Sequence, residues 1–146
     1  MKGKLKMEEF EGKLIELNNR FYRALEEGDI TIMEEVWLTD ENAKCVHPGW
    51  PLLKGWSEIK ESWERIFDSG ELSDVKISDT FVEISENAAM INCVEKLSHY
   101  IGGQTVITMA QTTNIFEMID SRWYMVLHHA SPIPVPRAEN YSDTLQ

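Results

Sequence analysis

Apolar residues in the first part of the chain recur at alternating steps of three and four. Between residues 7 and 27 this spacing places one stripe of side chains along a helix: Met7, Phe10, Leu14, Leu17, Phe21 and Leu25. Gly28 is placed to end this helix, and Asp29 to cap a short second one. A third stripe starts near Trp56 and stops at Gly70. The pattern therefore predicts three helices in the first half of the chain.

From residue 74 the apolar positions alternate instead, which is typical of strands. Four runs rich in β-branched and apolar residues follow, at about 74–84, 88–101, 104–118 and 122–130. Two-residue turns separate them, at Glu86–Asn87, Gly102–Gly103 and Asp120–Ser121. A short strand is also expected at 43–47, ended by Pro48, which cannot donate to a ladder. Helices first and a meander of strands afterwards predict an α+β fold, with a long sheet curled around three helices.

Both faces of the run 88–101 carry apolar residues. Met90 and Val94 lie on one face, whereas Ile91 and Cys93 lie on the other. The helices can cover only the concave face of the curled sheet. We therefore expect a second copy of the chain to cover the convex face, as a homodimer.

The composition sets limits on the partners. A chain of 146 residues is expected to form one domain, here residues 1–136, followed by a loose tail at 137–146. The net charge of −11 argues against nucleic acid and against an anionic membrane surface. Cys45 and Cys93 each lie in an apolar stretch and are expected to be packing residues. With no apolar run of transmembrane length and no signal segment, we expect a cytoplasmic protein.

Several local motifs resemble the nuclear-transport-factor-2-like superfamily. They are Phe-Tyr-Arg-Ala-Leu-Glu-Glu-Gly-Asp at 21–29, Cys-Val-His-Pro-Gly-Trp at 45–50 and Gly-Trp-Ser-Glu-Ile-Lys-Glu-Ser-Trp at 55–63. The ending, with Thr-Asn-Ile-Phe at 113–116 and Arg-Trp-Tyr-Met-Val-Leu-His-His-Ala-Ser-Pro at 122–132, resembles the SnoaL-like branch. The resemblance covers about residues 8–135. It implies a cone-shaped, cystatin-like barrel with a pocket between the helices and the concave sheet, and a dimer through the convex face.

The same resemblance argues against steroid isomerisation by the mechanism of the ketosteroid isomerase-like members. Their catalytic aspartate corresponds to His47. Their oxyanion-donating tyrosine falls on Phe21, and their second donor falls near Thr112. Without both donors an enolate would lose its main stabilisation. A comparison with scytalone dehydratase-like members instead points to His47, His128 and Tyr22, although the full dehydratase set has no counterpart.

His47 and His128 are the candidate catalytic groups. His47 is either a general base held by the Pro-Gly turn or a structural histidine bonded to the loop. Strand parity puts His128 and His129 on opposite faces, and the resemblance to the isomerase-like members implies that His128 points into the cone together with Tyr124 and Val126; one bulge would reverse this assignment.

Other positions are predicted to line the pocket, namely Phe21 and Tyr22 on the first helix, Trp50 in the loop and Trp63 as an aromatic floor. Three polar strand residues join them as predicted ligand-binding positions: Asn92, Thr112 and Asn114. Glu95 and Lys96 are expected at the dimer face and the rim. The spacing of histidines and cysteines predicts no metal site, and the lack of a glycine-rich phosphate loop predicts no cofactor.

Three functions remain open from the sequence. The first is a homodimer whose apolar pocket binds a small organic molecule. The second is a cofactor-free isomerase, cyclase or dehydratase that uses His47 as its base. The third is a protein-association domain without catalysis. A fold of this kind hosts unrelated roles, so the choice depends on the site.

Overall fold

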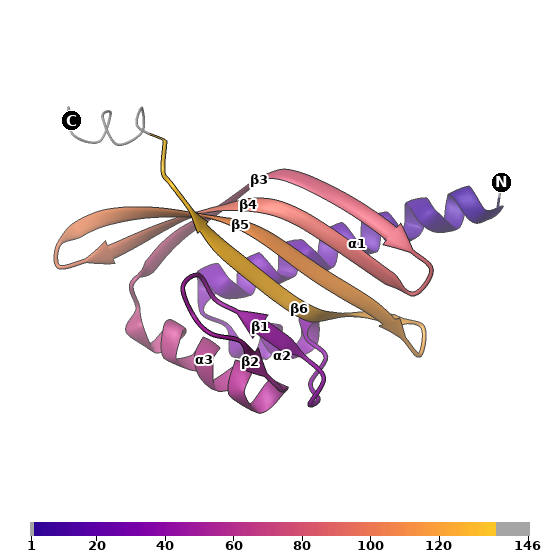
Figure 1. The fold of residues 1–146 in the computed structure, drawn as a ribbon, viewed down its shortest axis with the longest axis horizontal. Coiled ribbons are helices and arrows are strands. Elements are labelled where there is room, and N and C mark those ends of the chain that lie inside the picture. Colours follow the sequence, from indigo (N-terminus) through magenta and orange to yellow (C-terminus); the bar gives the residue numbers. More distant parts are fainter. Residues whose placement is uncertain (1, 137–146) are drawn as a thin grey trace.

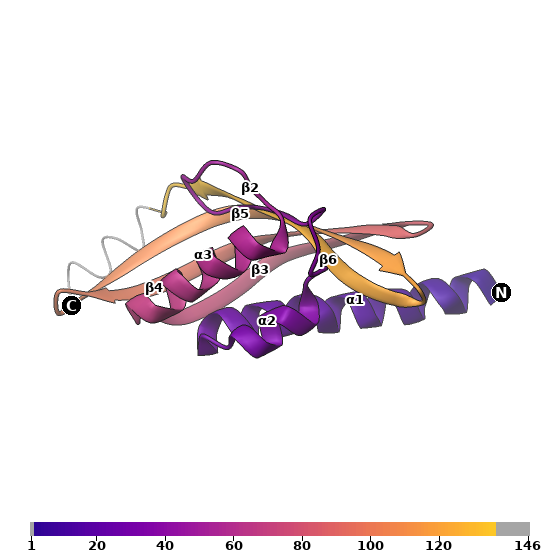
Figure 2. The same cartoon turned by 90° about the horizontal axis from the view of Figure 1, so that it is seen from below.

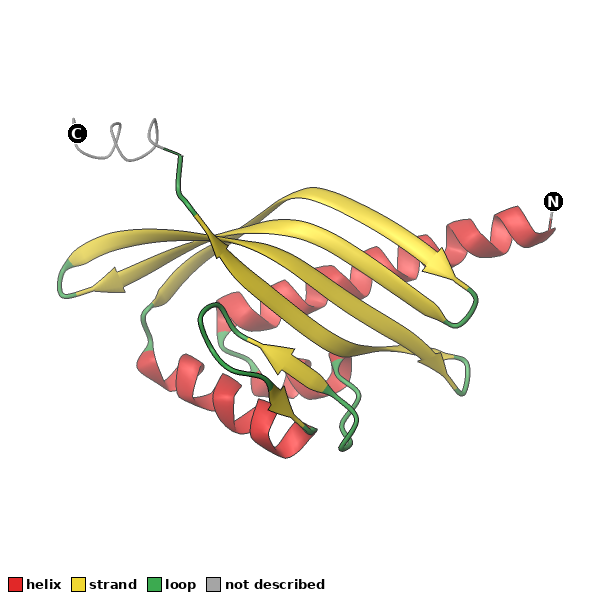
Figure 3. Ribbon diagram, in the orientation of Figure 1, coloured by secondary structure: helices red, strands yellow, loops and turns green. Residues whose placement is uncertain are grey.

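The structure is a computed structural model that describes residues 2–136. The loose tail predicted at 137–146 lies outside the described residues. The helices are α1 (Lys2–Glu27), α2 (Ile30–Val36) and α3 (Trp56–Ser69). The strands are β1 (Lys44–Val46), β2 (Leu53–Lys54), β3 (Leu72–Ser85), β4 (Ala88–Ile101), β5 (Gln104–Ile119) and β6 (Arg122–Ile133). The predicted α+β class is confirmed, and Figure 3 shows the long strands as one curved sheet.

The six strands form a single sheet in the order β2-β1-β6-β5-β4-β3. The long strands β3 to β6 pair antiparallel, whereas the short strand β1 runs parallel to β6. The short strand β2, which pairs with β1, was absent from the sequence prediction. Its two residues are too few for a pattern of alternation to show. The parallel pairing sets Cys45 beside His128, so the end of β1 lies next to the middle of β6.

The tight turns between the long strands match those expected from the sequence. Gly102 and Gly103 have φ angles of 58° and 80°, and Asp120 and Ser121 have φ angles of 50° and 67°. Positive φ at both central residues is the geometry that suits the twist of paired strands. The turn chemistry therefore fixes the register of the meander before any packing does.

The helices are arranged against one side of this sheet. Figure 1 shows α1 crossing behind the long strands, with its first turns extending past the β3–β4 hairpin. Figure 2 shows α1 and α2 on one side of the curved sheet. The largest fully buried side chains include Trp37 from the end of α2, Trp63 from α3, and Phe21 from α1. The core therefore fills the cone between the helices and the concave face.

Two further sequence predictions can be compared with this fold. Cys45 and Cys93 are both buried and form no disulfide. Within residues 2–136, no helix combines the length and the apolar character needed to cross a bilayer. The predicted homodimer stays a prediction, since the structure holds one chain.

Candidate functional site

The interior of the cone contains an unusual number of polar side chains. Buried polar residues in the structure are contributed by helices, loops and strands alike: Asn18, His47, Ser62, Glu95, Thr112, Asn114 and His128. Tyr22, which is 5% exposed, lies among them. Polar groups in a core lose their hydration, so each needs a partner or a functional reason to be there.

Four of these residues form a continuous chain of hydrogen bonds. The Tyr22 hydroxyl donates to Glu95 Oε2 at 2.6 Å. The Asn114 amide Nδ2 donates to the Tyr22 oxygen at 3.1 Å and to Asn18 Oδ1 at 2.9 Å. His128 Nδ1 lies 2.7 Å from Asn114 Oδ1. The chain joins α1 to β4, β5 and β6 across the interior of the cone, and we call these four residues, Tyr22, Glu95, Asn114 and His128, the polar chain.

The direction of these bonds fixes the tautomer of His128. An amide oxygen can only accept a hydrogen bond, so Nδ1 of His128 carries the proton. Its Nε2 atom is left as an acceptor, and it lies 4.0 Å from Glu95 Oε2. His128, Asn114 and Tyr22 thus each donate one hydrogen bond along the chain toward the Glu95 carboxyl group, which favours mutual polarisation, while Asn114 also donates to Asn18.

Burial shifts the acid–base properties of the polar chain. Desolvation raises the pKa of Glu95 above its ordinary value, and the hydrogen bond from Tyr22 and the nearby Thr112 hydroxyl offset part of that rise. Burial and the nearby Glu95 carboxylate raise the pKa of Tyr22 well above its ordinary value. Burial also holds the pKa of His128 well below its usual range. His128 and Tyr22 are therefore neutral at physiological pH, and the contact between His128 and Glu95 is not an ion pair.

His47 sits beside this chain and has a separate set of contacts. Ser62 donates its only hydroxyl proton to the carbonyl oxygen of Ile59 at 2.6 Å. Its oxygen must therefore accept from His47 Nε2, which lies 2.8 Å away. The remaining ring nitrogen, Nδ1, is 3.9 Å from the sulfur of Cys45. Desolvation lowers the pKa of His47 to about 4, so the imidazole is neutral.

Aromatic rings surround the two histidines. The ring centroid of Trp63 lies 4.6 Å from that of His47 and 5.8 Å from that of His128. The ring centroid of Phe21 lies 4.8 Å from that of His128 and 5.6 Å from that of Trp63. Trp50 meets His47 edge-on at 4.8 Å, and it is 38% exposed. The predicted group of His47, His128, Phe21, Trp50 and Trp63 does come together in space.

Three polar atoms in the core around the histidines have no hydrogen-bond partner among the described residues. They are Oγ1 of Thr112, the indole Nε1 of Trp63 and the indole Nε1 of Trp37, whose ring centroid lies 6.3 Å from that of Phe21. Thr112 is fully buried, and Trp63 is 2% exposed. The Thr112 hydroxyl lies close enough to Glu95 to lower the pKa of that carboxyl group, although Thr112 Oγ1 forms no hydrogen bond with it. Unpaired buried donors cost free energy, so they mark a place where another group is expected to bind.

Asn92 does not belong to this site, contrary to the sequence prediction. Its neighbours Ile91 and Cys93 are both fully buried, so the side chain of Asn92 points to the opposite, convex face. There its amide donates to Thr113 Oγ1 at 2.9 Å. The prediction was wrong because both faces of β4 carry apolar residues, which left the parity of the strand undecided.

Tyr124 is a second correction. Trp123 and Met125 are buried on either side of it, so Tyr124 faces away from the cone. A register shift explains this, because Ile115 pairs with Leu127 while Phe116 pairs with Met125. Val126 is the extra residue of this bulge and is half-buried. His128 points into the cone, as predicted. The residues that precede the bulge point the opposite way from the prediction.

Three buried residues of the site were missed from the sequence. Glu95 was expected at the dimer face or rim, yet it shares its parity with Ile91 and Cys93 and is 2% exposed. That shared parity was the available signal, and it was overridden by the general preference of carboxylates for the surface. Asn18 and Ser62 were missed for a similar reason, since each is a polar residue inside an apolar helical stripe.

The cone itself is closely packed. Two surface hollows are well defined within residues 2–136, and neither is lined by a residue of the polar chain, by His47 or by Trp63. Access to the polar groups therefore requires a side chain at the rim to move, and Trp50 is the most exposed of the surrounding aromatic rings. Among residues 2–136, no group of three His, Cys, Asp or Glu side chains is arranged to hold a metal ion.

The fold and this interior place the chain in a known class. It belongs to the SnoaL-like domain family, whose sequence profile matches residues 14–136. The predicted membership of the nuclear-transport-factor-2-like superfamily is thereby confirmed.

Individual relatives differ in their described roles. The chain is 28% identical over 118 residues to the F-box protein SKIP8 of Arabidopsis thaliana, covering 81% of this chain. It spans about half (48%) of the length of that relative. A putative dehydratase of the NTF2-like family from Streptomyces avermitilis is 27% identical, with a TM-score of 0.74 over 84% of this chain and 95% of its own.

Another similar structure is a putative calcium/calmodulin-dependent protein kinase type II association domain from Thiobacillus denitrificans. It is 26% identical, with a TM-score of 0.65 over 81% of this chain and 93% of its own. An NTF2-like superfamily protein from Salmonella enterica, at 20% identity and a TM-score of 0.75 over 85% of this chain and 91% of its own, shows the shared fold. The relatives thus fix the family and leave the function to the residues of the site.

The lowered pKa of His47 predicts a specific pH dependence. An imidazole with a pKa of about 4 when folded, against an ordinary 6.5, binds fewer protons in the folded state than in the unfolded state. Its contribution to stability is therefore complete above about pH 6.5 and is lost as the pH falls toward 4. At 1.36 kcal/mol per pKa unit, the full loss is about 3 kcal/mol. In His47→Gln the free energy of unfolding should fall less between pH 7 and pH 4.5 than in the unmodified protein, as measured by urea unfolding.

His129→Gln is the matched control, because His129 is an exposed histidine on the neighbouring strand. In this variant the free energy of unfolding should fall with decreasing pH as steeply as in the unmodified protein. Equal slopes for all three proteins would show that His47 titrates normally and is not held neutral by burial.

Proposed function

We propose that the chain binds a small organic molecule inside the cone, as a homodimer paired through the convex face of the sheet. The observation that carries this proposal is the pair of unpartnered buried atoms, Thr112 Oγ1 and Trp63 Nε1, next to the polar chain. A ligand with its own donor and acceptor would satisfy both.

The energetics of the polar chain support the same conclusion. Burying a carboxyl group such as that of Glu95, which is 2% exposed, costs several kcal/mol when it is ionised, and hydrogen bonds recover only part of that cost. Replacing buried charged groups with apolar residues of similar volume often leaves the stability of a protein unchanged or raises it. Perturbed acid–base groups gathered in one interior are instead typical of binding and catalytic sites.

The chemistry of the available atoms indicates the class of ligand. Nε2 of His128 can accept a hydrogen bond, the indole of Trp63 can donate one, and Thr112 can do either. The faces of Phe21 and Trp63 provide an aromatic wall. We infer a compact, neutral organic molecule with a carbonyl or hydroxyl group, because bringing a charged ligand into this buried interior would carry a large desolvation cost. Entry would require Trp50 to move from the edge of His47.

Thr112→Val tests this proposal sharply. The substitution removes only the unpartnered hydroxyl, so the free energy of unfolding should stay the same or rise by up to about 1 kcal/mol. Ligand binding should weaken about five- to tenfold, the value of one lost hydrogen bond of roughly 1 kcal/mol. The ligand would first be sought by mass spectrometry of molecules released on denaturation, and by a thermal-shift screen of small carbonyl and hydroxyl compounds.

Thr113→Val is the control, since Thr113 is the next residue of β5 and bonds Asn92 on the convex face. It should lose some stability and bind ligand normally. Light scattering of the unmodified protein and of this variant would report the proposed dimer, and a monomeric unmodified protein would contradict that part of the proposal. If Thr112→Val binds as tightly as the unmodified protein, the cone is not the binding site.

A second candidate function is cofactor-free proton transfer, in which Glu95 and His128 act on a bound carbonyl compound. The 4.0 Å separation of His128 Nε2 and Glu95 Oε2 favours it, because both groups could reach one ligand. The raised pKa of Glu95 makes its carboxylate a better base than an exposed one. His47 suits this role less well, since its Nε2 is bonded to Ser62 and its pKa is about 4. The dehydratase description of the Streptomyces relative is consistent with this candidate.

Exchange of deuterium from solvent into the position next to the carbonyl of a bound ligand would test proton transfer. The unmodified protein should catalyse the exchange, and Glu95→Gln should lower its rate at least about a hundredfold, the lower range for a general base. A Glu95→Gln protein that binds ligand and exchanges at the normal rate would eliminate the catalytic candidate and leave binding intact. The protein-association alternative rests on the description of the Thiobacillus relative and has no comparable observation in the site.

A further inference from the structure

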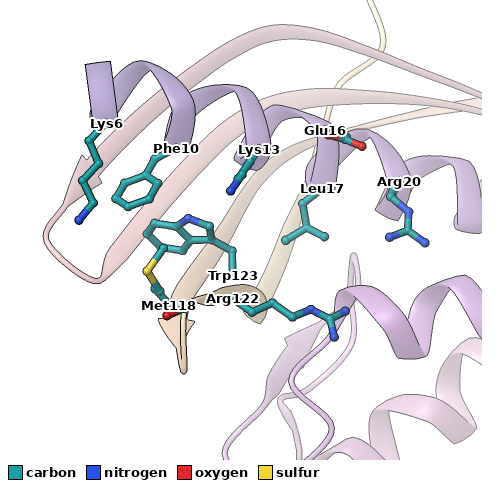
Figure 4. Close-up of a pocket in the computed structure, with 10 residues that line it drawn as sticks. Lys6, Phe10, Lys13, Glu16, Leu17, Arg20, Met118, Arg122 and Trp123 are labelled. Carbon is teal, nitrogen blue, oxygen red and sulfur yellow. The ribbon is translucent and has the colours of Figure 1, made fainter. Parts of the chain in front are cut away.

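The larger surface hollow lies outside the cone. It has a volume of about 410 Å³ and is bounded by the first half of α1 and by the hairpin that joins β5 to β6. Figure 4 shows side chains from both elements converging on it. This volume falls within the range of small-molecule sites.

The floor of the hollow is apolar and aromatic. Phe10 and Trp123 meet edge to face, with their ring centroids 5.5 Å apart. Leu17 from α1 and Met118 from β5 complete the apolar lining. Trp123 is 5% exposed, and its indole Nε1 has no partner among the described residues. Figure 4 shows this nitrogen on the ring edge that faces α1.

The rim of the hollow is basic, in a protein whose net charge is −11. Four of the 14 lysines and arginines line it, against a single carboxylate, that of Glu16: Lys6, Lys13, Arg20 and Arg122. Two of the four cations have carboxylate partners on their outer sides. Lys13 pairs with Glu9 at 3.2 Å, and Arg20 pairs with Glu35.

The other two cations have different partners. Lys6 Nζ lies 5.5 Å from the ring centre of Phe10. Arg122 donates to the carbonyl oxygen of Glu35 at 2.8 Å and stacks over the ring of Tyr124. Among the described residues, neither of these two side chains has a carboxylate partner. The hollow combines an aromatic floor with surplus positive charge.

We propose that this hollow is a second binding site, for a small organic anion in which a carboxylate is carried on a flat apolar body. The body would pack on Phe10 and Trp123, and the carboxylate would lie between Lys6, Lys13 and Arg122. The Trp123 N–H would supply a further donor from the same wall. This site is independent of the ligand proposed for the cone, because the two share no lining residue.

The shape of the hollow and the net charge of the protein favour a free small molecule, and not an anionic membrane, as the occupant of this site. The basic groups surround a hollow instead of forming a flat patch, and the remainder of the protein is strongly acidic. A surface of that net charge is repelled by anionic lipid.

The test uses 2-naphthoate as the probe and 2-naphthalenemethanol as its neutral counterpart. In ¹⁵N spectra of the full chain, 2-naphthoate should shift the indole signal of Trp123 and leave that of Trp63 in place. Calorimetry should show that the neutral alcohol binds about tenfold more weakly, since it lacks the Coulomb attraction of the rim. The Trp123 signal is assigned from its absence in Trp123→Phe.

The double variant Lys6→Glu/Lys13→Glu should weaken 2-naphthoate binding at least about tenfold, because attraction becomes repulsion at two exposed positions. Lys4→Glu/Lys44→Glu carries the same change in net charge on exposed residues outside the hollow, and it should bind within about twofold of the unmodified protein. Equal losses in the two double variants, equal affinity for the alcohol, a shift of Trp63 instead of Trp123, binding only to anionic vesicles, or no binding at all would each overturn the proposal.

Discussion

The hydrogen bond from the Tyr22 hydroxyl to the Glu95 carboxyl group is the interaction on which the interior of this protein depends. It spans 2.6 Å between α1 and β4, and it provides a donor for a carboxyl group that has no access to water. Without that donor Glu95 would be buried without compensation, which is among the most destabilising situations in a core. The remaining members of the polar chain, Asn114 and His128, extend the same arrangement to β5 and β6.

The polar chain fixes the positions and the hydrogen-bonding roles of the side chains inside the cone. Each hydrogen bond of the polar chain has one possible donor and one possible acceptor. His128 therefore has a fixed tautomer and presents Nε2 toward Glu95. The neighbouring Thr112 and Trp63 are left without partners. The closely packed interior thus combines donors and acceptors fixed by the polar chain with neighbouring polar atoms that have no partner.

Most of the fold could be predicted from the sequence, because it is carried by periodicity. The stripes of α1 and α3 and the alternation of the four long strands are strong local signals, and the Gly102–Gly103 and Asp120–Ser121 turns mark where the chain reverses. What could not be predicted depends on pairing across the sheet. The bulge at Val126 turns Tyr124 outward, and no local pattern reveals a bulge that is set by the register against β5. The first turns of α1 were missed because lysines, not apolar residues, dominate residues 2–6.

The candidate site was predicted in part, for related reasons. His47, His128, Phe21 and Trp63 converge as expected, while Asn92 points away. Glu95 was missed because a carboxylate is normally placed at the surface, and only its parity with Ile91 and Cys93 argued otherwise. Residues that defy their usual environment are the hardest to predict, and here they form the centre of the site.

The central claim is that the polar chain is retained for binding and not for folding. The free energy of unfolding of Glu95→Gln at pH 7 tests it most directly, because glutamine keeps an oxygen to accept from Tyr22 and removes the buried charge. The account predicts a protein as stable as the unmodified one, or more stable by up to a few (about 1–4) kcal/mol. A loss of about 3 kcal/mol or more would contradict it, since the carboxylate would then be a requirement of the fold itself.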